Sequence, residues 1–252
     1  MYIGRTAAIL HGALVGVGLI VGGLVLAAEL RRRGRSDFRF WYLVAGALVG
    51  GALLERLGTW LRHLTPGANP GLAEQWLYGS RSILSALVGA YAGVLVAKRL
   101  CRYESPTGDL FAPAIAAGMA VGRIGCLLTE RPGTPTGGRW GVTLSTAQAA
   151  AVPGAPAGVP LHPSFAYEIL FHLVALVVLL CLRDRVTVPD ALFTGYLAAY
   201  AIFRFGVEFV RGNEVVAAGL TRPQLFLLAC SPLLAWRVWR VRGERRVPAG
   251  VA

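Results

Sequence analysis

The sequence predicts an all-α integral membrane protein with seven transmembrane helices, its N-terminus outside and its C-terminus in the cytoplasm. Hydrophobic residues make up 55% of the 252 residues and charged residues only 15%, and the mean hydropathy is +0.57. The apolar residues fall into runs of the length that crosses a bilayer as a helix. These runs fill nearly the whole chain, so we expect one polytopic domain over residues 1–252.

The first three expected spans lie in the N-terminal half of the chain. The first does not resemble a cleavable signal peptide, because only Arg5 precedes its apolar run and RRRGR follows it. The second contains the adjacent charges Glu55 and Arg56, and the third follows Arg81 directly. Glycines at small-xxx-small spacing in these runs favour close helix packing. We expect these spans at 7–30, 41–61 and 82–97.

The other four spans follow a short connection. The fourth contains Arg123 near its end, the fifth begins after Pro163, and the sixth contains Arg204. A long segment rich in glycine, proline and alanine, at about 129–163, separates the fourth span from the fifth and is either a mobile external loop or a functional one. We expect the remaining spans at 110–128, 164–182, 191–210 and 220–238.

The distribution of cations predicts the orientation. Arginine and lysine cluster after the first, third, fifth and seventh spans, and cytoplasmic loops carry such an excess. The C-terminus is therefore expected in the cytoplasm and, with an odd number of spans, the N-terminus outside. The clustered cations are Arg31, Arg32, Arg33, Arg35, Arg39, Lys98, Arg99, Arg102, Arg183, Arg185, Arg237, Arg240, Arg242, Arg245 and Arg246.

Several classes of function are disfavoured. The net charge of +12 would suggest nucleic-acid binding in a soluble protein, but topology explains it here and we expect no nucleic-acid partner. The four cysteines are scattered and form neither a disulfide framework nor a metal motif. With no phosphate-binding or dinucleotide fingerprint either, we expect no metal and no cofactor.

Charges within the apolar runs mark the expected site. An arginine at bilayer depth costs about 2.5–3.5 kcal/mol on insertion scales, so such residues usually face a bundle interior or a wet cavity. We therefore expect a buried, mostly cationic site suited to an anionic, lipid-like substrate. The charges are Arg56, Arg81, Arg123 and Arg204, with Glu55, Glu168 and Glu208.

Two motifs carry the strongest signals. Arg123 stands between Gly122 and Gly125, which would let a substrate approach its guanidinium, a group suited to phosphate capture; the alternative is an arginine that snorkels to the outer interface. In the sixth span one helical face combines four polar residues, and either binds substrate or holds a structural ion pair between the second and third of them. These four are Tyr200, Arg204, Glu208 and Arg211.

Histidines supply further candidates. His162 and Ser164 begin the fifth span, with Tyr167 and Glu168 one turn later. A serine hydrolase triad is less favoured than a helix start, because the nucleophile-elbow motif is absent. His11, alone in the first span, and His172 fit core positions as well as functional ones.

At these motifs the chain resembles the prolipoprotein diacylglyceryl transferase family. The family pattern GRxGNFxNGE, HPSQLYE, GxxxxxYxxxRxxxExxR and GLTxGQ is similar to GRIGCLLTE, HPSFAYE, GYLAAYAIFRFGVEFVR and GLTRPQ here, in the same order. The resemblance implies transfer of the diacylglyceryl group from phosphatidylglycerol to the lipobox cysteine thiol of a prolipoprotein signal peptide. Membrane lipid and the signal peptide are the implied partners, and the cytoplasmic (inner) membrane is the implied location.

The resemblance also implies roles for individual residues. Arg123, Arg204, Glu208 and His162 would be catalytic. The implied substrate-binding residues are Arg56, His11, Cys126, Tyr167, Glu168, Tyr200 and Arg211.

The chain departs from the family pattern at four places. Leu84 stands where the family has a histidine in the third span, Cys126 replaces an asparagine, and His11 replaces a tyrosine; Glu130 comes one position before the expected acid. A family-like protein that binds lipid or lipoprotein without transfer is therefore the alternative function.

Overall fold

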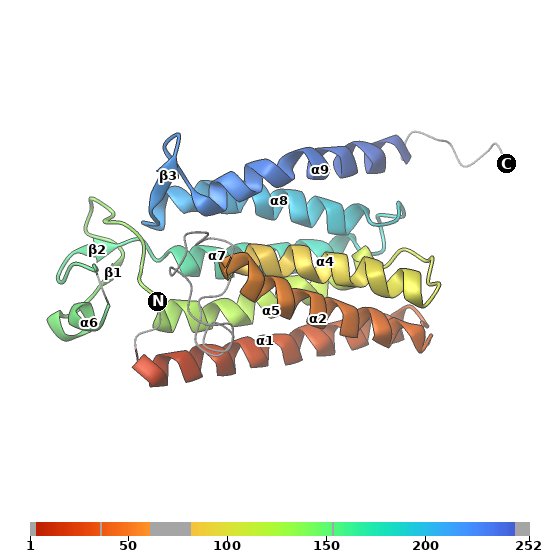
Figure 1. The fold of residues 1–252 in the computed structure, drawn as a ribbon, viewed down its shortest axis with the longest axis horizontal. Helices are drawn as coiled ribbons and strands as arrows, with labels where there is room; N and C mark the ends of the chain where they lie inside the picture. Colours follow the sequence, from red (N-terminus) through yellow and green to blue (C-terminus); the bar gives the residue numbers. More distant parts are fainter. Residues whose placement is uncertain (1–3, 36, 61–81, 153, 245–252) are drawn as a thin grey trace. The chain divides into compact units, whose positions relative to one another are not determined.

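The computed structural model describes residues 4–35, 37–60, 82–152 and 154–244, and the chain forms two compact units (Figure 1). One unit comprises Met1–Gly34 with Pro106–Ala252, and the other comprises Arg35–Ser105. The expectation of a single domain over 1–252 stays a prediction.

The larger unit contains most of the helices. They are α1 (Gly4–Arg32), α5 (Gly108–Thr129), α6 (Thr146–Ala151), α7 (Ser164–Leu182), α8 (Ala191–Val207), the 3-10 turn η1 (Glu208–Val210) and α9 (Arg222–Glu244). Its four short strands form two antiparallel pairs, β1 (Val142–Thr143) with β2 (Pro160–Leu161) and β3 (Val215–Ala217) with β4 (Leu220–Thr221). The smaller unit contains α2 (Arg39–Trp60) and α4 (Ile83–Leu100).

Among the described residues, five helices are long and apolar enough to cross a membrane. They correspond to the first five expected spans and support an all-α membrane protein. The segments are Ile9–Arg32, Arg39–Leu57, Ile83–Leu100, Gly108–Thr129 and Ser164–Leu182.

The last two expected spans differ from the helices observed. The sixth was expected over 191–210, but α8 ends at Val207 and a 3-10 turn follows. The seventh was expected over 220–238, but its first two residues pair in β4 and α9 extends to Glu244. The seven-span count and the orientation therefore remain predictions.

Glycines set the contact between α1 and α5. A Cβ built on Gly18 would lie 2.6 Å from the backbone oxygen of Gly118, so only glycine permits this approach. Within the smaller unit, α2 and α4 pack in the same way, since a Cβ on Gly46 would lie 2.6 Å from the oxygen of Gly93. The expected close packing at small-residue spacings is confirmed at these positions.

Small side chains bury α5 between its neighbours. Ala112 and Ala116 are fully buried against Leu179 of α7 and against Leu192 and Tyr196 of α8. Because alanine allows both helices to approach, α5 becomes the central helix of the larger unit. The polar residues near its C-terminal end are consequently enclosed by protein.

The segment expected to be a long loop at about 129–163 has secondary structure of its own. A capping box between Ser145 and Gln148 begins α6. The antiparallel pair places Val142 opposite Leu161, whose side chain is completely buried. This packing ties the segment to the start of α7 and thereby fixes the position of the HPSFAYE motif.

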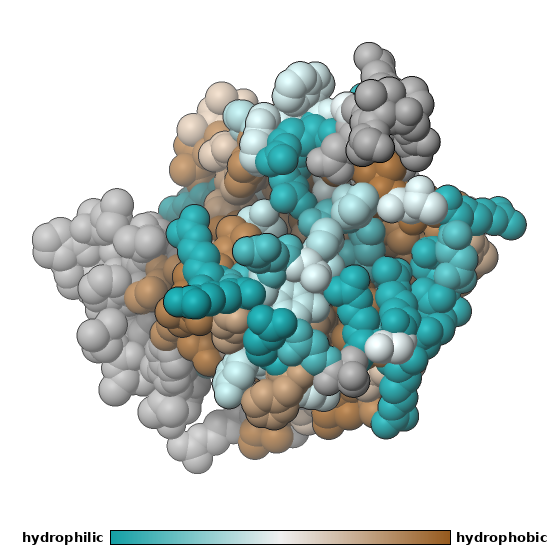
Figure 2. All heavy atoms as spheres, turned by 90° about the vertical axis from the view of Figure 1, so that its right-hand side faces the viewer, coloured by the Kyte–Doolittle hydropathy of each residue, from teal (hydrophilic) through white to brown (hydrophobic). Residues whose placement is uncertain are grey.

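The opposite end of the unit is charged. Figure 2 looks onto the end at which α1 and α7 finish and α5 and α8 begin, and hydrophilic side chains gather there. The buried carboxylate of Glu29 accepts hydrogen bonds from Arg32, at 3.0 Å, and from Arg183. These contacts join the last turn of α1 to the end of α7.

Candidate active site

Chain direction brings the polar motifs together. The C-terminal ends of α5 and α8 lie at the same end of the larger unit as the N-terminal end of α7 (Figure 1). Arg123, Glu168 and Arg204 stand near these three helix ends. Residues more than 30 positions apart in sequence therefore meet within one buried region.

Arg123 is held by two partners from neighbouring helices. Its Nη2 lies 2.7 Å from the Oε2 of Glu168 and donates a hydrogen bond of 3.3 Å to the Tyr200 hydroxyl. The hydroxyl in turn donates to the same carboxylate oxygen at 3.4 Å. Arg123 is 7% exposed and Glu168 is completely buried. Arg123 therefore points into the protein and does not snorkel to the surface.

Arg204 and Glu208 form the ion pair that their spacing predicts. Nη1 of Arg204 donates to Oε2 of Glu208 across the end of α8. The other carboxylate oxygen accepts hydrogen bonds from Asn213, at 2.6 Å, and from the Thr221 hydroxyl, at 2.9 Å. Both charged residues are buried. The pair forms although Glu208 lies in the 3-10 turn and not in α8. The other hydrogen bonds to its carboxylate come from residues that follow this turn.

Arg211 links the two pairs. Its Nη1 donates to Oε1 of Glu168, and its Nε lies 3.9 Å from the Glu208 carboxylate. Its guanidinium also lies 4.3 Å above the Phe165 ring, and its Nη2 is 3.9 Å from Glu130. The expected polar stripe thus exists as a network, although the last two of its members, Glu208 and Arg211, lie beyond the α-helix.

Both principal arginines keep an unused donor. The Nε atoms of Arg123 and Arg204 are buried and have no hydrogen-bond partner among the described residues. A buried donor without an acceptor is costly, and native proteins rarely keep one without a reason. An Nε–H and an adjacent Nη–H together form the fork that grips a phosphate. The network therefore contains two Nε donors, one on Arg123 and one on Arg204, that could each take part in such a contact.

His162 lies apart from the arginines in its hydrogen bonding. Its Nδ1 is 3.0 Å from the Tyr167 hydroxyl, and its ring packs edge-on against Trp140, with ring centroids 5.1 Å apart. Its backbone oxygen accepts from the Ser164 amide at 2.8 Å, and the buried Ser164 hydroxyl has no partner among the described residues. The described contacts pair the His162 ring with tyrosine and show no serine triad.

His172 belongs to the core, as its position suggested. It is completely buried and its Nδ1 lies 3.0 Å from the Tyr196 hydroxyl. Its ring packs at 4.8 Å from the Tyr200 ring. His172 thus supports the wall behind Tyr200.

Two other expected residues meet at the contact of α1 with α5. The Cys126 sulfur accepts from Arg123 Nη1 at 3.7 Å. His11 Nδ1 lies 3.4 Å from the Thr129 hydroxyl and 3.9 Å from Glu130 Oε1. These contacts connect His11 and Cys126 to the arginine network through Glu130 and Arg123.

Three positions named from the sequence lie outside the part of the larger unit that the structure describes. Arg56, on α2, and Leu84, buried on α4, belong to the smaller unit. Arg81 lies outside the described residues.

Some residues of the network had no role assigned from the sequence. Gln224 accepts from the Thr221 amide at 2.9 Å and donates to the backbone oxygen of Phe205 at 3.2 Å, which holds the start of α9 against α8. Thr221 and Gln224 lie in GLTRPQ, a motif that the sequence comparison with the family pattern had already indicated. Asn213 follows the stripe by two residues, and its spacing gave no indication of its contact with Glu208.

Comparison with known proteins agrees with these motifs. A family profile described as prolipoprotein diacylglyceryl transferase matches residues 1–239. The chain is 32% identical over 204 residues to a phosphatidylglycerol–prolipoprotein diacylglyceryl transferase of Dehalococcoides mccartyi, covering 77% of this chain and 74% of the relative. A protein of that name from Halalkalibacterium halodurans is 29% identical over 245 residues, covering 92% and 83%. This chain belongs to the prolipoprotein diacylglyceryl transferase family.

Proposed function

We propose that this protein transfers the diacylglyceryl group of phosphatidylglycerol to the lipobox cysteine thiol of prolipoproteins. Its relatives carry the names of phosphatidylglycerol-dependent transferases. The observation within this chain that supports the proposal most is the pair of Nε donors on Arg123 and Arg204, which have no hydrogen-bond partner among the described residues. Both are buried in one network, where a phosphodiester could accept from them.

The two arginines would act on the leaving group. As the glyceryl carbon–oxygen bond breaks, the departing glycerol phosphate gains negative charge. Fixed donors aimed at that charge stabilise the transition state more than the ground state. Glu168 and Glu208 would orient the guanidiniums, since Glu168 pairs with Arg123 and Glu208 pairs with Arg204.

The attacking group is the thiolate of the substrate cysteine, so the thiol must lose a proton. The candidate bases are His162, His11 and Glu208. Glu208 is the least suited, because its carboxylate accepts from Arg204, Asn213 and Thr221. His162 lies beside the Tyr167 hydroxyl, and His11 lies beside the Glu130 carboxylate.

We also propose the membrane arrangement expected from the cations. The chain would cross the cytoplasmic membrane seven times, with its N-terminus and the arginine network toward the outer side. The five apolar helices support a membrane location. The cation-rich ends of α1 and α7, which Figure 2 views, would then face the cytoplasm.

The test is replacement of a depleted transferase by this chain. Phosphatidylglycerol-dependent attachment of lipid to a lipobox peptide should follow, measured by the mass of the peptide. A peptide with serine at the lipobox cysteine is the matched control. Absence of transfer by purified, folded protein would contradict the proposal.

A second function has one specific observation in its favour. Leu84 occupies the position at which the resembled pattern has a histidine. A protein that binds phosphatidylglycerol without transferring its diacylglyceryl group would be stabilised by that lipid against heat and would yield no lipidated peptide. Measuring the thermal midpoint of the purified protein with and without phosphatidylglycerol, beside the peptide lipidation, separates the two functions.

A further inference from the structure

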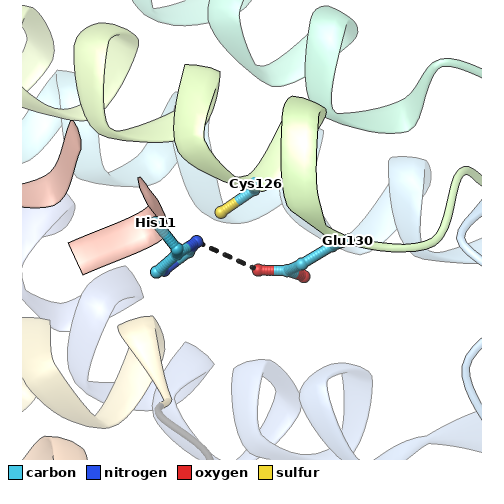
Figure 3. Close-up of side chains that lie close together, drawn as sticks. All are labelled: His11, Cys126 and Glu130. Carbon is cyan, nitrogen blue, oxygen red and sulfur yellow. Dashed lines mark ion pairs between the residues drawn. The ribbon is translucent and has the colours of Figure 1, made fainter. Parts of the chain in front are cut away.

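Three metal-binding side chains meet where α1 crosses the end of α5. His11 comes from α1, Cys126 from the last turns of α5, and Glu130 from the residue that caps α5. Figure 3 shows the three side chains directed toward one another. One ligand atom from each lies within 4.8 Å of the others. They are the only such group of three or more among the residues that the structure describes.

The spacing is close to that of a coordination shell. His11 Nδ1 and Glu130 Oε1 lie 3.9 Å apart. Metal–ligand distances of about 2.0–2.3 Å in a tetrahedral shell place ligand atoms roughly 3.3–3.8 Å from one another. Side-chain rotations alone can supply this difference, because Cys126 and Glu130 project from one helix end with a spacing of four residues.

Gly125 of α5 allows the close contact with α1 at His11. A Cβ on Gly125 would lie 3.2 Å from the Leu14 Cβ and 3.4 Å from the His11 backbone oxygen. Glycine at this position therefore lets α1 approach α5 at the level of His11. The Thr129 hydroxyl donates to the Gly125 oxygen at 2.6 Å and also lies 3.4 Å from His11 Nδ1. The bond to Gly125 orients the Thr129 hydroxyl, and this hydroxyl in turn contacts His11 at the end of α5.

We propose that His11, Cys126 and Glu130 form a binding site for a divalent transition metal of the zinc class. Imidazole, thiolate and carboxylate together suit Zn²⁺, and three protein ligands leave a fourth position for another group. His11 and Cys126 are also two of the positions at which the chain departs from the pattern that it resembles. The two substitutions thus bring two metal-binding groups into contact with the same carboxylate.

The surroundings fit a cation bound through an anionic shell. The two ionised ligands, Cys126 as thiolate and Glu130, would balance the charge of the metal. Arg211, whose Nη2 lies 3.9 Å from Glu130, competes with a metal for the carboxylate. Cys126 is buried, and the Glu130 side chain is 32% exposed, which gives a metal access from solution.

The fourth position suggests a role, which rests on the proposed transfer. A thiol that coordinates a metal is deprotonated. The lipobox thiol would lose its proton to solvent on binding the metal, within reach of Arg123. Its sulfur electron pair would then form the bond to the glyceryl carbon, and the carbon–oxygen bond would break with its pair left on the phosphate. In this step the metal would stabilise the thiolate, so that no protein side chain would need to accept the proton.

The decisive experiment is spectroscopic. The full chain, purified in detergent without a polyhistidine tag and stripped with chelator, is titrated with Co²⁺ and then with Zn²⁺. We expect one equivalent of Co²⁺ to bind, with a thiolate-to-cobalt charge-transfer band and the strong visible absorption of tetrahedral Co²⁺. Zn²⁺ should then displace it.

Matched variants locate the site. Cys126→Ser should abolish the charge-transfer band, and His11→Ala and Glu130→Gln should each weaken Zn²⁺ binding by more than about tenfold, since even outer partners contribute 10–100-fold. Cys181→Ser, at the exposed cysteine of α7, should leave the spectrum unchanged. Variants are compared only where circular dichroism and gel filtration match the parent chain; the half-exposed Glu130 provides the test if Cys126→Ser does not fold.

The outcomes separate the claims. Absence of Co²⁺ binding by the parent chain, or binding that all three ligand variants retain, would overturn the site. Addition of a lipobox peptide should intensify the thiolate band, whereas its serine counterpart should not. No response to the cysteine peptide would remove the role in thiol activation. Because these spectra do not require turnover, a chain that binds metal and fails to transfer lipid would overturn the proposed transfer and leave the metal site intact.

Discussion

The Arg123 guanidinium lies 2.7 Å from the Glu168 carboxylate, and both groups are buried between α5 and α7. One Nη of the arginine is committed to Glu168 and Tyr200, while its Nε has no partner among the described residues. The arginine is therefore oriented from one side and open for hydrogen bonding at Nε. A structural ion pair would need only the first of these features.

Replacing Arg123 by lysine should strongly slow transfer while leaving the protein folded. Lysine keeps the charge beside Glu168 but cannot make a planar two-point contact with phosphate. We expect a loss of about 10²–10³-fold in the rate of peptide lipidation, as for other fixed donors to a developing anion. Arg139→Lys, at an exposed arginine of the segment 129–163, is the control. Full activity in Arg123→Lys would show that only its charge matters.

Removing the Glu208 carboxylate should lower the stability of the folded protein. Glu208→Ala leaves Arg204 buried without its carboxylate, and breaking such a pair costs about 3–5 kcal/mol. The thermal midpoint in detergent should fall accordingly. The double variant Arg204→Met with Glu208→Leu should regain much of the stability and remain inactive. An active double variant would contradict a role of Arg204 in phosphate binding.

The contact of α1 with α5 should tolerate a methyl group at Gly16 and reject one at Gly18. A Cβ on Gly18 would meet the Gly118 backbone oxygen at 2.6 Å, whereas no atom lies within 4 Å of a Cβ on Gly16. Gly18→Ala should lower the thermal midpoint, with an overpacking cost of about 1–3 kcal/mol. Gly16→Ala should raise it slightly, because alanine favours helix by up to about 1 kcal/mol. Equal shifts in the same direction would contradict this packing.

Orientation is open to chemical labelling. Arg139→Cys places a thiol at an exposed position of the segment 129–163, and we expect an impermeant maleimide to label it from outside intact cells. Cys101, which follows the cation-rich end of α4, should react only after the membrane is opened. The other natural cysteines are replaced in both cases. Labelling of Cys101 alone in intact cells would reverse the proposed orientation.

The sequence by itself determined the apolar helices and most of the charged site. Runs of apolar residues specify a helix locally, because a backbone in lipid must satisfy its own hydrogen bonds. The spacing of four between Arg204 and Glu208 likewise specifies their pairing, because helix geometry brings such residues together. Arg123, Glu168 and Tyr200 were selected because charge and polarity in an apolar run require a partner.

Only the tertiary structure decided which of these groups meet. Arg211 joins Glu168 to Glu208, although it lies 43 residues from Glu168 in the sequence. Asn213 and Thr221, which follow the end of α8, donate hydrogen bonds to the Glu208 carboxylate. The meeting of His11 with Cys126 and Glu130 depends on glycines that let α1 approach α5. Periodicity describes the face of one helix, and it contains no information about which side chains of another helix lie opposite, since helix packing and chain reversal set those distances.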